Sequence, residues 1–221
     1  MAIGRPKRQS PSRRGEITRE LVLTEGARLF RENGYAGTST RMLAGALGVQ
    51  SASLYHHVAT KEALLNEICR EGWRVMNEAV ETAATSSDDG LEALCAVIRS
   101  HLTTAIEHRN VFITMLTEAR SLSVPHQRAV RRMRSEYSAV LEEVIERAQA
   151  QGSLRNDIPS HQLMLVLRNL LSWTLFWYRT DGTMSLDELI ALITKMFLEG
   201  GATADGSVRA EQIVTAASGS E

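Results

Sequence analysis

Hydrogen-bonding side chains lie on both sides of Gly48 between residues 38 and 61 of this 221-residue chain. Hydroxyl residues that can cap a helix come first, and Gly48 then supplies the backbone freedom of a tight corner between two helices. Gln, Ser, Tyr and His follow. Gln can bind the edge atoms of adenine in pairs, Ser can approach bases or phosphates, and Tyr and His can reach phosphates. The pattern predicts a helix-turn-helix whose second helix lies against DNA.

The second helix of this motif is expected near residues 51–57, with Leu54 inward and its polar side outward. Lys61 follows at the start of the next helix, where its ammonium and the free N–H groups could hold a phosphate. The alternative is an ordinary polar surface turn. The predicted DNA contacts of the motif are Thr38, Thr40, Arg41, Gln50, Ser51, Ser53, Tyr55, His56 and Lys61.

The charge distribution supports this prediction. The first 61 residues hold ten Lys or Arg against four Asp or Glu, although the whole chain has a net charge of −1. Residues 1–15 form a basic arm that we expect to be disordered and to follow phosphates or enter the minor groove. A solubilising tail is the alternative. The arm's predicted DNA contacts are Arg5, Arg8, Arg13 and Arg14.

The same residues carry a family resemblance. The runs 40–44, 48–49, 53–57 and 61–65, together with the apolar stripe of the preceding helix, resemble the TetR family of bacterial transcriptional regulators. The resemblance covers about residues 16–66. It implies a helical body that pairs through a four-helix bundle and holds a small-molecule pocket. A bound ligand would then loosen DNA binding by changing the spacing of the two DNA-binding heads, through a tilt of the helix at 60–84.

Apolar residues recur at helical spacing along the rest of the chain, which therefore reads as all-α with about nine helices. The expected domains are a disordered arm at 1–15, a three-helix DNA-binding domain at 16–62, an effector-binding and dimerisation domain at 63–201, and a disordered tail at 202–221. The expected helices are about 16–33, 39–46, 51–57, 60–84, 88–107, 109–121, 125–151, 159–178 and 185–200.

A homodimer is expected because one recognition helix contacts few base pairs, and a palindromic operator offers two half-sites. The helix at 159–178 is apolar around nearly its whole circumference, so it must be covered on all sides. Burial inside one subunit is the alternative. The predicted interface residues are Leu163, Val166, Leu167, Leu170, Leu175, Trp177, Leu189, Ile193, Met196 and Phe197.

A pocket for an unknown small-molecule effector is predicted among the body helices, although each of its residues could equally be ordinary core. The predicted lining is Trp73, Met76, Leu94, Ile98, Phe112, Met115, Tyr137, Leu141, Arg168, Asn169 and Trp173. His101 is a further polar group on a mostly apolar helix and, like Arg168 and Asn169, could meet a ligand head group or lie at a solvated edge. The loop at 177–182 is similar to that of regulators of fatty-acid, acyl-CoA or steroid breakdown, which makes a lipid-like or acyl-CoA effector one candidate. A hydrophobic drug or other aromatic compound is its competitor.

Other functions fit less well. No phosphate-binding glycine loop or nucleophile-and-base arrangement appears, so an enzyme is not expected. Two cysteines without metal-ligand spacing predict reduced thiols and no metal or cofactor. No apolar stretch is long enough to span a membrane, which favours a soluble cytoplasmic protein. A protein-interaction module and a transcriptional activator with the same DNA-binding head remain alternatives.

Overall fold

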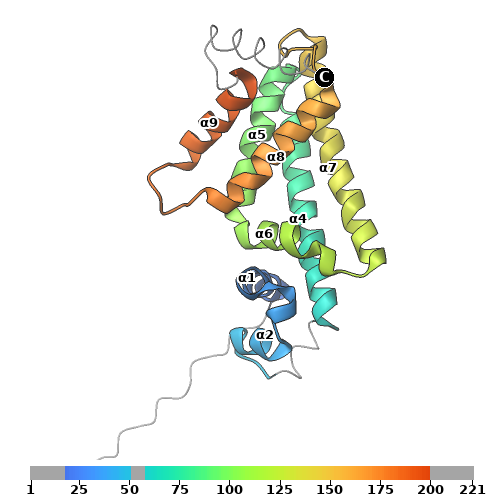
Figure 1. Ribbon diagram of the computed structural model, residues 1–221, viewed down its shortest axis with the longest axis vertical. Coiled ribbons are helices and arrows are strands. Elements are labelled where there is room, and N and C mark those ends of the chain that lie inside the picture. The colour runs from blue at the N-terminus through green and yellow to red at the C-terminus, as the bar shows by residue number, and fades with distance from the viewer. Residues whose placement is uncertain (1–17, 51–57, 200–221) are drawn as a thin grey trace, which may run out of the picture.

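The computed structural model describes residues 18–50 and 58–199 as an elongated stack of α-helices, with no strand in these ranges (Figure 1). Helices α1 and α2 form one end, and the other helices form the body above them. The helices are α1 (Arg19–Gly37), α2 (Thr40–Ala46), α4 (Lys61–Ala84), α5 (Gly90–Glu107), α6 (Arg109–Glu118), the 3-10 turn η1 (Ala119–Ser121), α7 (Val124–Ala150), α8 (Ser160–Trp177) and α9 (Leu186–Glu199).

Side-chain caps set the start of several helices. The hydroxyls of Ser39 and Thr60 accept hydrogen bonds from the free N–H groups of the first turns of α2 and α4. Before α9, Ser185 and Glu188 form a reciprocal capping box: the Ser185 N–H donates to Glu188 Oε2 at 2.7 Å, and the Glu188 N–H donates to Ser185 Oγ at 3.2 Å. The caps explain why these starts could be predicted within about two residues.

Glycines in the left-handed region make the two corners of the N-terminal end. Gly34 has φ = 71° and interrupts the helical backbone of α1, so the regular helix ends at Asn33 as predicted. Gly48 has φ = 67° in the turn after α2. Its neighbour Val49 is partly buried against the core, and its N–H donates to the carbonyl of Ala44. The chain is thereby directed toward residues 51–57, where the predicted recognition helix lies outside the described residues.

The body is built around α4, which packs along both α5 and α7. Its inward face carries large apolar side chains, among them Leu65, Ile68 and Val80, all fully buried. Helix α8 crosses over α7, and α9 packs against α5. A single hydrophobic core runs from α1 through the body to α9, so the end formed by α1 and α2 is continuous with the body and strain at one can reach the other.

Candidate DNA-binding face and ligand cavity

The described part of the predicted DNA-binding face lies on α2 and the turn after it. Arg41 and Gln50 are exposed and Thr40 is half-buried. These three side chains stay accessible because Leu43 and Ala44, on the opposite side of α2, are buried against the core. The predicted contacts Ser51, Ser53, Tyr55 and His56, and the arm residues Arg5, Arg8, Arg13 and Arg14, lie outside the described residues.

Thr38 does not belong to this face, which corrects the sequence prediction. Its side chain is buried, and its hydroxyl lies 2.8 Å from the carbonyl oxygen of Gly34 and 3.1 Å from that of Leu29. Thr38 therefore closes the end of α1, where backbone carbonyls would otherwise lack donors. Ser39 rather than Thr38 caps α2.

Lys61 also has a structural role that the sequence did not indicate. Its ammonium donates to the carbonyl oxygens of Tyr35 and Thr38, each at 2.9 Å, and lies 4.4 Å from the centre of the Tyr35 ring. These contacts tie the start of α4 to the end of α1. A lysine ammonium has three hydrogens, so one remains for a phosphate oxygen.

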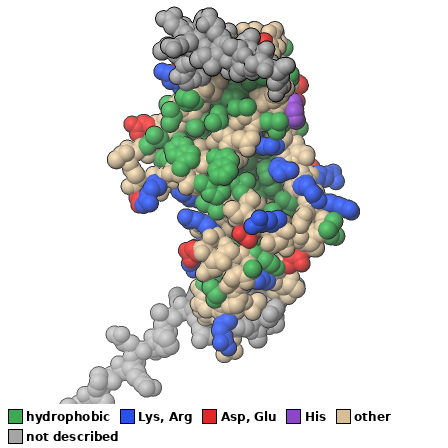
Figure 2. Space-filling model, viewed as in Figure 1, with side chains coloured by type: hydrophobic (Ala, Val, Ile, Leu, Met, Phe, Trp, Pro, Cys, Tyr) green, Lys and Arg blue, Asp and Glu red, His purple; other side chains and the backbone are tan. Residues whose placement is uncertain are grey.

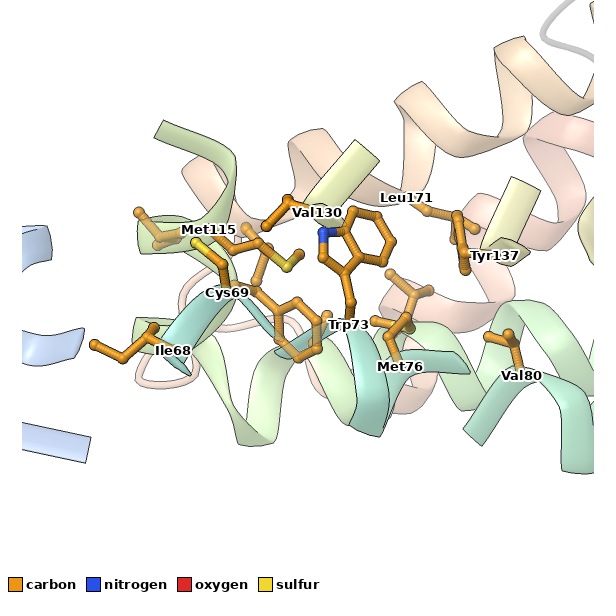
Figure 3. Close-up of a cluster of buried hydrophobic side chains, with 14 of the residues drawn as sticks. Ile68, Cys69, Trp73, Met76, Val80, Met115, Val130, Tyr137 and Leu171 are labelled. Atoms are coloured by element: carbon orange, nitrogen blue, oxygen red, sulfur yellow. The ribbon is translucent and has the colours of Figure 1, made fainter. Parts of the chain in front are cut away.

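A cavity of about 450 Å³ lies in the body between α4, α5, α6, α7 and α8. Eight of the predicted pocket residues line it: Trp73, Met76, Phe112, Met115, Tyr137, Arg168, Asn169 and Trp173. His101, which the sequence offered as a possible contact for a ligand head group, also lines the cavity. The lining is completed by Ala105, Leu116, Thr117, Arg134, Ser172, Leu175 and Phe176, which were not predicted to form the pocket. The predicted residues Leu94, Ile98 and Leu141 do not line it; their side chains are fully buried in the hydrophobic core. Figure 3 shows Trp73 between Met115, Met76 and Tyr137.

Three rings form one wall of the cavity. Trp73 and His101 flank Tyr137, each with its ring centre 5.6 Å from that of Tyr137. The Tyr137 hydroxyl lies 2.9 Å from His101 Nδ1. Complete burial lowers the pKa of His101 to about 3 and raises that of Tyr137. The imidazole is therefore neutral at pH 7.

The neutral imidazole leaves a hydrogen-bond donor on the cavity wall. If Tyr137 donates to Nδ1, the hydrogen of His101 sits on Nε2, and only that N–H lacks a partner. If Nδ1–H instead donated to the Tyr137 oxygen, both the Tyr137 hydroxyl hydrogen and the lone pair of Nε2 would lack partners. We therefore assign the hydrogen to Nε2. Nε2 of His101 and Nε1 of Trp73 have no hydrogen-bond partner among the described residues. A ligand oxygen would satisfy either donor.

Helix α6 joins the cavity to the DNA-binding end. Its residues Phe112 and Met115 line the cavity. On the opposite side it packs along α1, where the buried Thr114 hydroxyl donates to the carbonyl of Ala27 at 2.9 Å. Glu118, at the end of α6, accepts a hydrogen bond from the Tyr35 N–H at 3.1 Å. Helix α4, the link that the sequence pointed to, also lines the cavity and packs on α1, although less extensively than α6 does.

The predicted dimer residues of α8 and α9 differ in their exposure and fall into three groups. Leu163, Leu167, Leu175, Leu189 and Ile193 are buried within the subunit, because α8 packs on α7 and α9 on α5. Leu170 and Phe197 are half-buried. Val166, Trp177 and Met196 are exposed, together with Trp173, Phe176 and Leu192, and hydrophobic side chains gather on this face in Figure 2. The outward residues form an apolar surface, which we call the α8–α9 face.

Other expected features can be checked in the same ranges. Among residues 18–50 and 58–199, no three His, Cys, Asp or Glu side chains gather as a metal site, and no helix there has the length and hydropathy to cross a membrane. Both cysteines are free thiols. Burial raises the pKa of Cys69 to about 12, and Cys95 is half-buried with a raised pKa.

Comparison with known proteins gives matches along most of the chain. Residues 22–68 match the family described as bacterial regulatory proteins, tetR family, and residues 87–201 match tetracyclin repressor-like, C-terminal domain. The HTH-type transcriptional repressor KstR2 of Rhodococcus jostii is 29% identical over 82% of this chain and 90% of its own.

Two solved structures extend the comparison. The TetR family regulator PfmR of Thermus thermophilus superposes with a TM-score of 0.77, at 31% identity over 82% of this chain and 99% of its own. AibR, solved in complex with isovaleryl coenzyme A and operator DNA, has a TM-score of 0.75, at 25% identity over 81% of this chain and 97% of its own.

Proposed function

The chain belongs to the TetR family of bacterial regulatory proteins, and we propose that it is a homodimeric repressor that binds a palindromic operator. It dissociates from this operator when a small ligand with a hydrophobic body binds. Members of this family bind operator DNA and regulate transcription rather than catalyse a reaction. The name of the KstR2 relative supports repression. A regulator of bacterial transcription acts in the cytoplasm, where the chromosome lies.

The proposal is carried by the position of α6 between cavity and DNA-binding end. A ligand that fills the cavity contacts Phe112 and Met115, and any displacement of α6 is passed to α1 through Thr114. Ligand and operator would then favour different tilts of the same helices, which is the requirement for coupling between two sites. The lining is mostly apolar and aromatic, which suits an acyl chain, a lipid-like molecule or an aromatic compound.

The experiment begins with genomic fragments selected by the purified full-length protein, which supply the operator. Ligands are then screened for their ability to release that operator, measured by fluorescence anisotropy. Thr114→Val should bind the operator but lower the release caused by a ligand, since valine keeps the shape and loses the hydrogen bond to Ala27. Thr82→Val is the control, because Thr82 is exposed and its hydroxyl bonds within α4.

Two results would contradict the proposal. The first is the absence of any selected DNA. The second is a ligand that saturates the cavity without changing operator affinity.

A further inference from the structure

A second hollow, of about 250 Å³, opens beside the ligand cavity and shares part of its wall. Trp73, Met115, Leu116 and Arg134 line both spaces. The outer hollow, which we call the arginine groove, lies between the start of α7 and η1. The groove is further lined by Ala119, Arg120, Gln127, Val130 and Arg131. One molecule could therefore occupy both spaces.

The groove is cationic and its charges are not neutralised. Arg120, Arg131 and Arg134 are exposed, and their guanidinium groups form no ion pair or hydrogen bond within the described parts of the chain. In contrast, Arg74 is held between Glu71 and Glu78. The sequence shows the reason: α7 has arginines and no acidic residue from Val124 to Ser135.

A buried donor adds to these charges. Trp73 is only 6% exposed, and its indole N–H has no partner among the described residues. Figure 3 shows the indole nitrogen on the side of the ring toward Val130 and Met115, which both line the groove. Leaving a buried N–H unpaired costs stability. The groove thus offers a hydrogen-bond acceptor of a ligand both positive charge and a free N–H donor.

We propose that the arginine groove binds the phosphate groups of a ligand whose apolar part occupies the ligand cavity. A guanidinium pairs with phosphate through two parallel hydrogen bonds, and three such groups suit a head with several charges better than a single carboxylate. The ligand class is therefore an acyl or similar apolar group joined to a phosphorylated carrier such as a nucleotide. This inference rests on the proposed function, because it takes the cavity as the effector site.

The test compares three ligands that share one apolar body: decanoyl coenzyme A, decanoyl pantetheine, which lacks the phosphates, and decanoate. Binding to the full-length protein is measured by calorimetry without DNA. We expect decanoyl coenzyme A to bind at least about tenfold more tightly than decanoyl pantetheine, with an affinity that falls as salt rises. No binding of decanoyl coenzyme A, or equal affinities for all three ligands, would overturn the proposal.

Variants assign the effect to the groove. The double substitution Arg120→Gln with Arg131→Gln should remove most of the preference for decanoyl coenzyme A and leave the affinity for decanoyl pantetheine unchanged, because both arginines line the groove and neither lines the ligand cavity. Arg132→Gln is the matched control, because Arg132 lies on the same helix as Arg131, outside the groove, beside Glu136. An unchanged preference in the double variant contradicts the inference, as does a loss of ligand-free operator affinity, which would make the groove a DNA contact.

This binding assay separates the two proposals. If decanoyl coenzyme A binds through the arginines but does not release the operator, the groove assignment stands and the proposed function fails. If an uncharged compound releases the operator and the arginines have no effect on any ligand, the proposed function stands and the groove assignment fails.

Discussion

Lys61 was expected to contact DNA, but its ammonium donates hydrogen bonds to backbone carbonyls within the fold. Replacing it with methionine keeps the aliphatic stem but removes the donors to the carbonyls of Tyr35 and Thr38. We expect Lys61→Met to lower the free energy of unfolding by about 1–3 kcal/mol, measured by urea denaturation. Lys195→Met, at an exposed site on α9, should change it little. Unchanged stability in Lys61→Met would show that the observed contacts contribute nothing.

Glu62 gives a prediction for pH at the same scale. Its carboxylate accepts hydrogen bonds from the Ser123 N–H at 3.0 Å and from His126 Nδ1 at 2.9 Å. These bonds, chiefly those from Ser123, lower the pKa of Glu62 from 4.5 to about 2. A lowered pKa stabilises the fold above pH 4.5, and the contribution disappears as pH falls toward 2.

Thermal melting of Glu62→Gln and of the unchanged protein tests this expectation. The difference between their melting temperatures should be largest above about pH 5 and should shrink between pH 4.5 and 2. Glu143→Gln, at an exposed position with no ion pair to the described residues, should show no such trend. A constant difference across the range would mean that Glu62 has the same pKa in the folded and unfolded states.

Single residues also show where sequence reasoning ends. The capping role of Ser39 and the left-handed Gly48 could be predicted, because both depend on neighbours in the chain. The hydrogen bonds of Lys61 could not, because they depend on how α1 meets α4. The position of Thr38 could not, because it depends on the kink at Gly34 that brings its hydroxyl to the carbonyl of Leu29. The groove arginines were missed for a similar reason. The sequence did carry a sign of them, because the start of α7 has arginines and no acidic residue. Only the fold, however, places η1 and Trp73 beside these arginines.

Among the helices, α5 and α7 approach each other closely at one point. A Cβ atom on Gly90 would lie 2.7 Å from the Cα atom of Ala148 and closer still to its backbone nitrogen, so the start of α5 tolerates no side chain there. We expect Gly90→Ala to cost at least about 2 kcal/mol of folding stability, because backbone rather than a flexible side chain must move. Chemical denaturation measures this cost.

Gly45 in α2 is the matched control for that substitution. It is exposed and nothing would lie within 4 Å of an added Cβ. Alanine there should therefore stabilise the helix by about 0.5–1 kcal/mol. Similar effects of the two substitutions would contradict the close packing of α5 on α7.

The whole molecule leaves an apolar surface exposed that a single chain cannot cover. Val166 and Met196 are 53% and 44% exposed on the α8–α9 face, beside a groove lined by Leu170, Trp177 and Ile193. Exposed apolar patches of this kind mark interaction sites in soluble proteins. We expect the α8–α9 face to pack against the same face of a second copy. This contact would set the separation of the two DNA-binding ends, as a palindromic operator requires.

The double substitution Val166→Arg with Met196→Arg should therefore convert a dimer into a folded monomer, because it brings two like charges from each copy into the shared face. Light scattering should give the mass of one 24.4 kDa chain in place of twice that mass. Operator affinity should fall with it, since each head then binds one half-site alone. Val124→Arg, which changes an equally exposed valine at the start of α7, should leave the dimer intact. A monomer for the unchanged protein, or a dimer that survives the double substitution, would exclude the α8–α9 face as the contact.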